Sequence, residues 1–454
     1  MKTYGYDYVF SLNVDTVNEI LAGNLENVDQ TIDYSAVDKD SGSTITLNAR
    51  LAPWQMVGGQ NSLINLNVPI SQGSLALTGG AITGSYDLSG VTPELQITLG
   101  WVGAGDQQVE KGSGDQTQLT FNPDPSADQN NPGYVATLKI NDPDNRLDTV
   151  GTGILSGLMA DALFANRDNV AYVFANVNPT PPELASWLSP GEWQYFVSQG
   201  DGSDGALCFL CMLNDGDAFP SQPAFDSSAL QPSANSVVLI SQPTFFAHVV
   251  LPAVQSTFPG GTFQQTTTDG SSSITNSGDF NVDTVAVTSY SLTPSAAGDG
   301  LATSSSGGGP LTFLFGLADL PDASYNWTLT TVNPLSYDGT DITFAVDPNP
   351  VEQQNTTIHW YDWALLVVAG IFTDDELYAA IQALVEKFAD QAQNVGMSTI
   401  NANIQKATGG AVMNLGQVID WTKGGQTLTP STVGMSEAVF IAGNLKVPNS
   451  QNQG

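Results

Sequence analysis

Few residues in this 454-residue sequence have the types and the spacing that catalysis needs. The two histidines, His248 and His359, could each act as a general base beside a serine, cysteine or carboxylate. His248 lies in an apolar stretch with helical character, and His359 alternates with Trp360 and Asp362 as side chains do along a strand. Phosphate loops, nucleophile-elbow motifs and the HExxH zinc motif are absent from the sequence. We therefore expect a protein that is not an enzyme, with an unrecognised hydrolase using either histidine as the alternative.

The two cysteines, Cys208 and Cys211, have the spacing of a redox or zinc-binding pair. They lie within the apolar run 206–213, which is typical of a buried strand, and positions i and i+3 of a strand point to opposite faces. A redox pair normally opens a helix, and a zinc site would need a second pair of ligands. The sequence predicts two separate core thiols, with no metal and no cofactor.

The acidic segment 141–148 could bind calcium through Asp142, Asp144 and Asp148. It lacks the glycine and the distal glutamate of an EF-hand loop, and an arginine within it carries the wrong charge. A turn that leads into a helix, with Asp148 or Thr149 as the N-cap, is the interpretation that we favour. Paired carboxylates of the glycosidase type cannot be assigned, because 45 acidic residues supply many accidental pairs.

The charge of the chain excludes some classes of partner. Asp and Glu number 45 and Lys and Arg 11, which gives a net charge of −34 at pH 7. Binding to nucleic acid requires a cationic surface, so it is excluded, and attraction to an anionic membrane at neutral pH is disfavoured. Hydrophobic residues make up 41% of the chain, so the sequence is that of a folded protein and not of a disordered acidic one.

The elements that would position any site are mostly strands. Glycine, asparagine, aspartate and proline clusters separate runs that alternate between polar and apolar residues. These runs predict strands at Thr44–Leu51, Ser62–Val68, Leu95–Val102, Tyr134–Ile140, Val170–Val177, Ala206–Leu213, Thr284–Leu292, Tyr325–Thr331, Ile342–Val346 and Ile358–Phe372. The length of Ile358–Phe372 indicates a large curved sheet. The segments Pro259–Asp279 and Ser304–Pro310 are rich in Gly, Ser and Thr, and we expect them to be flexible hairpin tips.

Four segments have helical periodicity. The first begins at Asp15 as the cap, the second spans about 150–166, and the fourth spans about Asp374–Asn394. The third spans Thr244–Phe258, is apolar nearly all round, and contains Pro252, which should kink it. We therefore predict an α+β fold with long curved antiparallel sheets wrapping apolar helices.

A proline-rich break at 178–182 marks a candidate boundary between two halves, residues 1–182 and 183–454. A helix that is apolar on nearly every side must be enclosed by other elements. Incomplete enclosure would leave an elongated apolar tunnel for an acyl chain, and complete enclosure would give an ordinary packed core. For the tunnel, the expected lining residues are Val17, Ile20, Leu21, Phe245, Phe246, Val249 and Val250.

The N-terminus lacks the apolar core of a secretory signal, and no apolar run reaches the length of a membrane span. We expect a soluble protein that is cytoplasmic when it is made, and export without a cleaved signal stays open.

Two short motifs resemble a known family. The segment Thr3-Tyr-Gly-Tyr-Asp7, followed by a strand and a helix at about 14–22, resembles the start of the OrfX/P47 proteins that are encoded beside clostridial neurotoxin genes. Tyr6 stands where that motif would have tryptophan. A second similarity is Leu239-Ile-Ser, followed by Phe245 and Leu251-Pro252.

The resemblance implies a tubular lipid-binding (TULIP) fold of two halves, similar to bactericidal/permeability-increasing protein. It implies a protein that binds lipid or another apolar ligand and acts as an insecticidal protein or an accessory component of a bacterial toxin complex. The implied partners are toxin-complex proteins. The acidic charge of the chain separately predicts self-association or membrane contact at low pH, because protonation of carboxylates removes self-repulsion. The alternative is a scaffold subunit with a filled core and no ligand.

Overall fold

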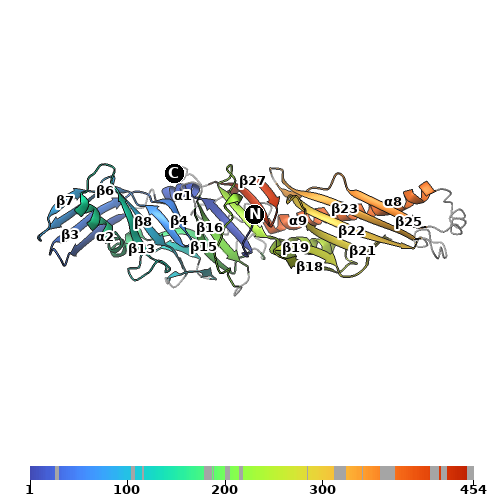
Figure 1. The fold of residues 1–454 in the computed structure, drawn as a ribbon, viewed down its shortest axis with the longest axis horizontal. Helices are drawn as coiled ribbons and strands as arrows, with labels where there is room; N and C mark the ends of the chain where they lie inside the picture. Colours follow the sequence, from blue (N-terminus) through green and yellow to red (C-terminus); the bar gives the residue numbers. More distant parts are fainter. Residues whose placement is uncertain are drawn as a thin grey trace. The chain divides into compact units, whose positions relative to one another are not determined.

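The computed structural model describes residues 1–25, 30–103, 108–114, 117–177, 187, 189–199, 205–213, 218–283, 285–310, 324–339, 341–357, 374–408, 419–420 and 427–446 (Figure 1). Strands dominate, and helices pack on the sheets, as expected for an α+β protein. The chain divides into two compact units. Unit 1 consists of Met1–Asp7, Leu239–Ala411 and Pro430–Ile441, and unit 2 consists of Tyr8–Val238, Val412–Thr429 and Ala442–Gly454.

Unit 2 contains three sheets in which all neighbouring strands are antiparallel. The first has the order β2 (Thr31–Val37), β3 (Thr44–Leu51), β6 (Ile70–Thr78) and β7 (Gly84–Asp87). The second has the order β13 (Val135–Asn141), β8 (Thr92–Thr98), β5 (Leu63–Asn67) and β4 (Gln55–Gln60). The third has the order β10 (Gln108–Val109), β9 (Gly100–Val102), β12 (Gln118–Phe121), β14 (Tyr172–Val177) and β26 (Ile419–Asp420).

A seven-stranded sheet contains the cysteine strand. Its order is β11 (Gly112–Ser113), β15 (Glu192–Ser198), β16 (Ala206–Met212), β1 (Tyr8–Asn13), β17 (Ser236–Ser241), β28 (Ala438–Lys446) and β27 (Thr427–Met435). Every residue of β16 is buried, so both faces of the sheet are covered at this strand. Cys208 lies opposite Ser11, and Cys211 lies opposite Tyr8. The prediction of a buried strand here is confirmed.

The two longest helices of unit 2 differ in how they begin. Helix α1 (Val14–Leu25) is capped by Asn13, whose Oδ1 accepts a hydrogen bond of 2.9 Å from the N–H of Thr16. The prediction of Asp15 as the cap was wrong, because the helix begins one residue earlier and Asp15 lies in its first turn. Helix α2 (Thr149–Ala165) is capped by Asp148, as predicted, and packs on β13 and β2 (Figure 1). A short helix α3 (Arg167–Val170) follows it.

Unit 1 is built on one fully antiparallel sheet of eight strands. Its main path is β18 (Phe263–Thr268), β19 (Ser271–Asn276), β21 (Val285–Pro294), β22 (Gly300–Pro310), β23 (Ser324–Tyr337) and β24 (Ile342–Phe344). Strand β20 (Phe280–Val282) pairs with β21, and β25 (Val351–Thr357) pairs with β23. Strand β23 has 14 residues, and its inner side chains are buried while most of its outer ones are exposed.

The two segments predicted as flexible hairpin tips have different outcomes. Ser304–Pro310 forms the second half of β22 and pairs along its length with β23. Glycine is required there for space, since a Cβ at Gly307 would lie 1.8 Å from the backbone oxygen of Ala286. Much of Pro259–Asp279 forms the hairpin of β18 and β19, with only Asp269 and Gly270 in the turn. The hairpin predicted for Pro259–Asp279 is thus confirmed, whereas the prediction of a tip at Ser304–Pro310 was wrong because this segment is a paired strand.

The third predicted helix is present in three parts: α4 (Gln242–Phe245), a π-helix η4 (Phe246–Val250) and α5 (Leu251–Thr257). Pro252 occupies the second position of α5, directly after the wide π turn. The expected interruption thus takes the form of a π turn, which accommodates the missing N–H of a proline. The fourth predicted helix is α8 (Asp374–Asp390), continued by a π-helix η5 (Gln391–Val395) and α9 (Gly396–Thr408).

Several predictions lie outside the described residues, namely the strand Ile358–Phe372, His359 and the proline-rich break at 178–182. The chain passes between the compact units several times, one of them at Val238 and Leu239. The division at 182 into TULIP-like halves stays a prediction. None of the helices in the described part of the chain combines the length and the apolar character needed to cross a membrane.

Candidate functional site

The seven residues predicted to line a tunnel are all core residues. In unit 2, Val17, Ile20 and Leu21 are at most 2% exposed and form the inner face of α1. This face packs against β4, β1 and β16. In unit 1, the remaining four are at most 4% exposed and belong to α4 and η4: Phe245, Phe246, Val249 and Val250. The structure therefore confirms their burial, while their role as the lining of a tunnel stays a prediction.

The helical segment of unit 1 carries an aromatic cluster. The ring of Phe245 lies 6.3 Å from that of Phe344, and Phe258 at the end of the segment is stacked on Phe388 of α8 at 5.8 Å. Phe258 also contacts Phe263 at the start of β18. The segment packs against β18, β19 and α9. Its apolar side chains are thus surrounded by strands on one side and by helices on another.

The family-like motif at the N-terminus lines a pocket of about 460 Å³ in unit 1, which we call the N-terminal pocket. The N–H of Tyr6 donates to the carbonyl of Thr3, and both residues between them, Tyr4 and Gly5, have positive φ angles of 52° and 95°. This is the geometry of a type I′ turn, which explains why the motif contains glycine. The pocket is lined by Lys2, Thr3, Tyr4, Gly5, Tyr6, Asp7, Ser241, Pro243, Asp269, Gly270 and Glu437.

A relay of hydrogen bonds joins the motif to the helical segment. The Oγ of Ser241 donates to the Oγ1 of Thr244 at 2.7 Å, and the Oγ1 of Thr244 donates to the Oδ1 of Asp7 at 2.8 Å. The backbone N–H of Ser241 donates to the carbonyl of Asp7 at 2.8 Å. Ser241 is also the N-cap of α4, so Asp7 fixes the start of the segment that carries the predicted lining residues.

The N-terminal pocket is acidic on balance. Asp7, Asp269 and Glu437 contribute negative charge, and Lys2 forms an ion pair of 3.1 Å with Glu437. Tyr4 is 45% exposed and offers an aromatic surface beside these carboxylates. The polar and charged lining of the N-terminal pocket does not suit an acyl chain. None of the seven predicted lining residues is among the residues that form this pocket.

His248 is an exposed residue of η4. Partial burial lowers the pKa of its imidazole, and the nearby negative charge of Asp7 opposes this shift. Hydrolase chemistry at His248 or His359 stays an untested alternative.

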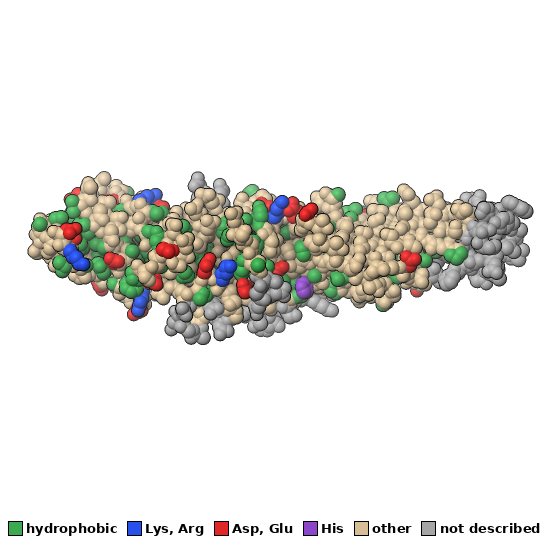
Figure 2. Space-filling model, turned by 60° about the horizontal axis from the view of Figure 1, so that its bottom comes forward, with side chains coloured by type: hydrophobic (Ala, Val, Ile, Leu, Met, Phe, Trp, Pro, Cys, Tyr) green, Lys and Arg blue, Asp and Glu red, His purple; other side chains and the backbone are tan. Residues whose placement is uncertain are grey.

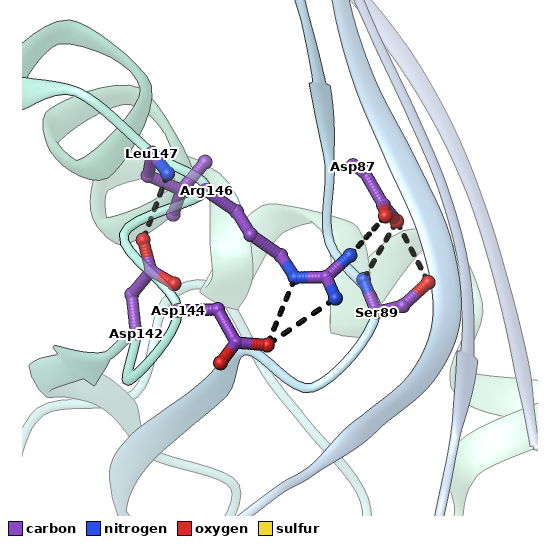
Figure 3. A network of polar contacts seen from close by, with 6 residues as sticks. All are labelled: Asp87, Ser89, Asp142, Asp144, Arg146 and Leu147. Carbon is purple, nitrogen blue, oxygen red and sulfur yellow. Dashed lines mark hydrogen bonds and ion pairs between the residues drawn. The ribbon is translucent and has the colours of Figure 1, made fainter.

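The acidic turn before α2 is held by its own side chains (Figure 3). The Oδ2 of Asp142 accepts a hydrogen bond of 2.7 Å from the N–H of Leu147, and Arg146 pairs with Asp144 at 3.2 Å and with Asp87. Asp148 caps the helix at 2.8 Å from the N–H of Gly151. Across the described ranges, no group of three or more His, Cys, Asp or Glu residues could hold a metal ion. The interpretation as a capped turn agrees with this geometry.

The two thiols lie apart from any site. Cys208 and Cys211 are both buried and are not joined by a disulfide. The Sγ of Cys208 lies 3.2 Å from the Oγ of Ser11, and burial raises the pKa of this thiol to about 12. At neutral pH the thiol is protonated, which suits a core residue and not a nucleophile.

Comparison with known proteins identifies the family. The family model named OrfX-like, described as protein OrfX2/OrfX3/P47, matches residues 3–301. Protein P47 of Clostridium botulinum (strain Kyoto / Type A2) is 22% identical over 253 residues, which are 55% of this chain and 56% of that protein. The aligned sequence therefore spans little more than half of this relative.

The structural likeness extends further along the chain. The structure of P47 from Clostridium botulinum A2 matches with a TM-score of 0.69 and 19% identity over 98% of both chains. That of P47 from Clostridium botulinum E1 matches with a TM-score of 0.69 and 18% identity, over 98% of this chain and 100% of the other. These matches show a shared fold. Because the family model covers well over half of the sequence, this chain belongs to the OrfX-like family.

Proposed function

We propose that this protein binds lipid or another apolar ligand in its interior and takes part in the action of a bacterial toxin complex. The observation that carries the proposal is the segment Gln242–Thr257, in which Phe245, Phe246, Val249, Val250 and Val254 are all buried in unit 1. A helix with so much apolar surface needs an apolar environment on several sides. An acyl chain beside Phe246 and Val249 would supply part of it. The proposed role is binding alone and includes no catalytic step.

Native mass spectrometry of the protein, purified from producing cells without detergent, tests the proposal directly. We expect a mass above that of the polypeptide, and organic extraction should release the bound molecule for identification. A ligand-free protein that also fails to bind lipids on overlays and liposomes would contradict lipid binding.

A matched pair of variants locates the ligand. Val249→Trp fills space next to the buried face of η4, and Val37→Trp makes the same change at a residue that is 63% exposed. We expect the extra mass to be lost from V249W and kept in V37W. Circular dichroism and thermal melting verify that V249W is folded. Retention of the ligand by a folded V249W would place it elsewhere.

A filled core that serves as a protein–protein scaffold is the second candidate. Dense burial of the seven predicted lining residues, each at most 4% exposed, favours it. In this case the protein carries no ligand, and it associates with companion toxin-complex proteins or with itself. Size-exclusion chromatography of the protein alone and mixed with such companions separates the two candidates.

The resemblance to proteins of clostridial toxin gene clusters is the basis for an insecticidal or accessory role. A feeding assay on insect larvae with the purified protein, alone and together with its companion proteins, tests this role. Toxicity that appears only in the mixture would identify an accessory component.

A further inference from the structure

Unit 2 contains a second cavity, of about 410 Å³, which we call the amide cavity. Its volume lies within the range of about 300–1,000 Å³ that is typical of small-molecule sites. Six segments that are far apart in the sequence form its wall. The lining residues are Asn61, Ser62, Thr98, Leu99, Glu110, Asn130, Gln194, Tyr195, Ser221, Gln222 and Pro223.

The floor of the amide cavity is rigid. The Oη of Tyr195 accepts a hydrogen bond of 2.9 Å from the N–H of Leu99 and donates one of 2.5 Å to the carbonyl of Ser62. One hydroxyl therefore joins β15 to the turn after β4 and to the junction of β8 and β9. Thr98 and Gln194 complete the floor and are only 3% and 8% exposed. A floor assembled in this way is preorganised and keeps polar atoms where water cannot fully solvate them.

The turn that carries Asn61 is also held in place. Asn61 has a positive φ of 56°, and its backbone exchanges two hydrogen bonds with Val197 of β15, at 3.1 and 2.7 Å. In another segment of the lining, the N–H of Asn130 donates to the Oδ1 of Asp128 at 2.9 Å, which fixes the backbone of that loop. Within the described residues, the side-chain amides of Asn61, Asn130 and Gln222 have no hydrogen-bond partner. They are thus available to a ligand.

The chemistry of this lining is unusual in a chain with a net charge of −34. Its described residues present four side-chain amides and four hydroxyl groups, together with one carboxylate, Glu110, and no lysine or arginine. An amide offers donors and an acceptor side by side, which matches hydroxyl groups that donate and accept at once. Glu110 can accept from two hydroxyls and repels an anion.

From this lining we infer that the amide cavity is a binding site for a neutral polyhydroxylated molecule of monosaccharide to disaccharide size. An anionic headgroup is disfavoured, because Glu110 would face it without a compensating cation in the lining. The inference is independent of lipid binding, since it concerns other residues and a different class of ligand.

Ligand-observed NMR and isothermal titration with methyl glycosides of glucose, galactose, mannose and N-acetylglucosamine test the inference. We expect at least one of them to saturate the protein below about 50 mM, a weak affinity typical of a small polar ligand. The double variant N130A/Q222A removes two rim amides and should weaken that binding about tenfold. The matched control N326A/Q353A removes the same two residue types from exposed positions of β23 and β25, and should leave binding within about twofold.

Ligand charge gives a second test that does not depend on truncating the rim. One of the neutral glycosides is expected to saturate the protein. Its uronic acid derivative, which carries a negative charge, should have an affinity for the native protein at least about tenfold lower. Glu110→Gln keeps the hydrogen-bonding shape, so it should retain the neutral sugar and gain the uronate. Failure of every neutral glycoside to saturate, equal binding by N130A/Q222A, or equal binding of uronate and neutral sugar by the native protein would each overturn the inference.

Discussion

The hydroxyl of Thr244 donates a hydrogen bond of 2.8 Å to the carboxylate of Asp7, although 237 residues separate the two in sequence. Asp7 ends the N-terminal motif, and Thr244 lies in α4 at the start of the apolar helical segment. Ser241 completes the relay from the other side by donating to Thr244 at 2.7 Å. The N-terminal motif therefore anchors the start of the apolar helical segment Gln242–Thr257.

Replacing Asp7 should destabilise unit 1. Asp7→Ala leaves the buried hydroxyl of Thr244 without its acceptor, so we expect a loss of about 1–3 kcal/mol in the free energy of unfolding. Urea denaturation measures it, and Asp279→Ala, an exposed aspartate of the same unit, should stay within about 0.5 kcal/mol of the native protein. In a double-mutant cycle, Thr244→Ala should cost less in the D7A background than alone. Additive losses would show that the two side chains are not coupled.

The inner face of α1 should behave as a packed core. Leu21 is 1% exposed, so Leu21→Ala should lower the free energy of unfolding by about 2–5 kcal/mol. The matched change Leu138→Ala, at a leucine that is 47% exposed, should cost about 0.5 kcal/mol or less. Chemical denaturation of both variants checks this. Equal effects would mean that α1 is not packed as described.

The thiol of Cys208 should be inert in the folded protein. Burial raises its pKa to about 12, so the reactive thiolate is scarce at pH 8. We expect Ellman's reagent to label Cys208 and Cys211 only after unfolding in urea, and mass spectrometry to find both reduced. Fast labelling of the native protein would contradict the burial of β16.

Much of the fold can be predicted from periodicity, because strands in these sheets bury one face. The predicted strand Thr44–Leu51 matches β3, and the predicted cap Asp148 begins α2. The failures have local physical causes. Ser304–Pro310 has the composition of a loop, yet its glycines are needed for close approach to neighbouring strands. Asp15, the predicted cap, and Asn13, the observed one, are both of residue types that cap helices well, and the strand β1 ends at Asn13, directly before α1.

The sites were harder to predict than the elements. The apolar faces of α1 and η4 were found, because a stripe of large side chains recurs at helical spacing. The amide cavity was missed, since its residues are single polar side chains from six segments between Asn61 and Pro223. The turn geometry of Asn61 and the burial of Thr98, Gln194 and Tyr195 distinguish them from ordinary surface residues. Those features exist in three dimensions and leave no motif in the sequence.

The cap of α2 makes part of the stability depend on pH. Hydrogen bonds from the N–H of Gly151 and the hydroxyl of Tyr86 lower the pKa of the Asp148 carboxyl below its ordinary value of 3.8. A carboxylate with a lowered pKa stabilises the folded state above its unfolded pKa, and this contribution is lost as the pH falls through the folded value. Asp148→Ala should therefore be less stable than the native protein at pH 7, and the gap should close below pH 4. Urea midpoints at several pH values measure it, and a gap of constant size would rule out this origin.

Acidification should also promote association. The net charge of −34 at pH 7 keeps copies of the chain apart, and it falls toward zero near the isoelectric point of about 4.1. Acidic side chains are spread over the face drawn in Figure 2 and are not confined to one patch, so the loss of repulsion affects a wide surface. Exposed apolar side chains such as Val37 and Val351 can then make contacts.

We therefore expect more oligomer in light scattering, and more protein floating with neutral phosphatidylcholine liposomes, at pH 4 than at pH 8. Neutral liposomes separate the loss of self-repulsion from attraction to charged lipid. High salt at pH 8 supplies the control, because it screens the same repulsion without protonating any carboxylate, and it should reproduce part of the oligomerisation. Equal amounts of oligomer and of liposome-bound protein at pH 4 and pH 8 would exclude acid-triggered association. Lipid binding at neutral pH would then be decided by the ligand mass that native mass spectrometry measures.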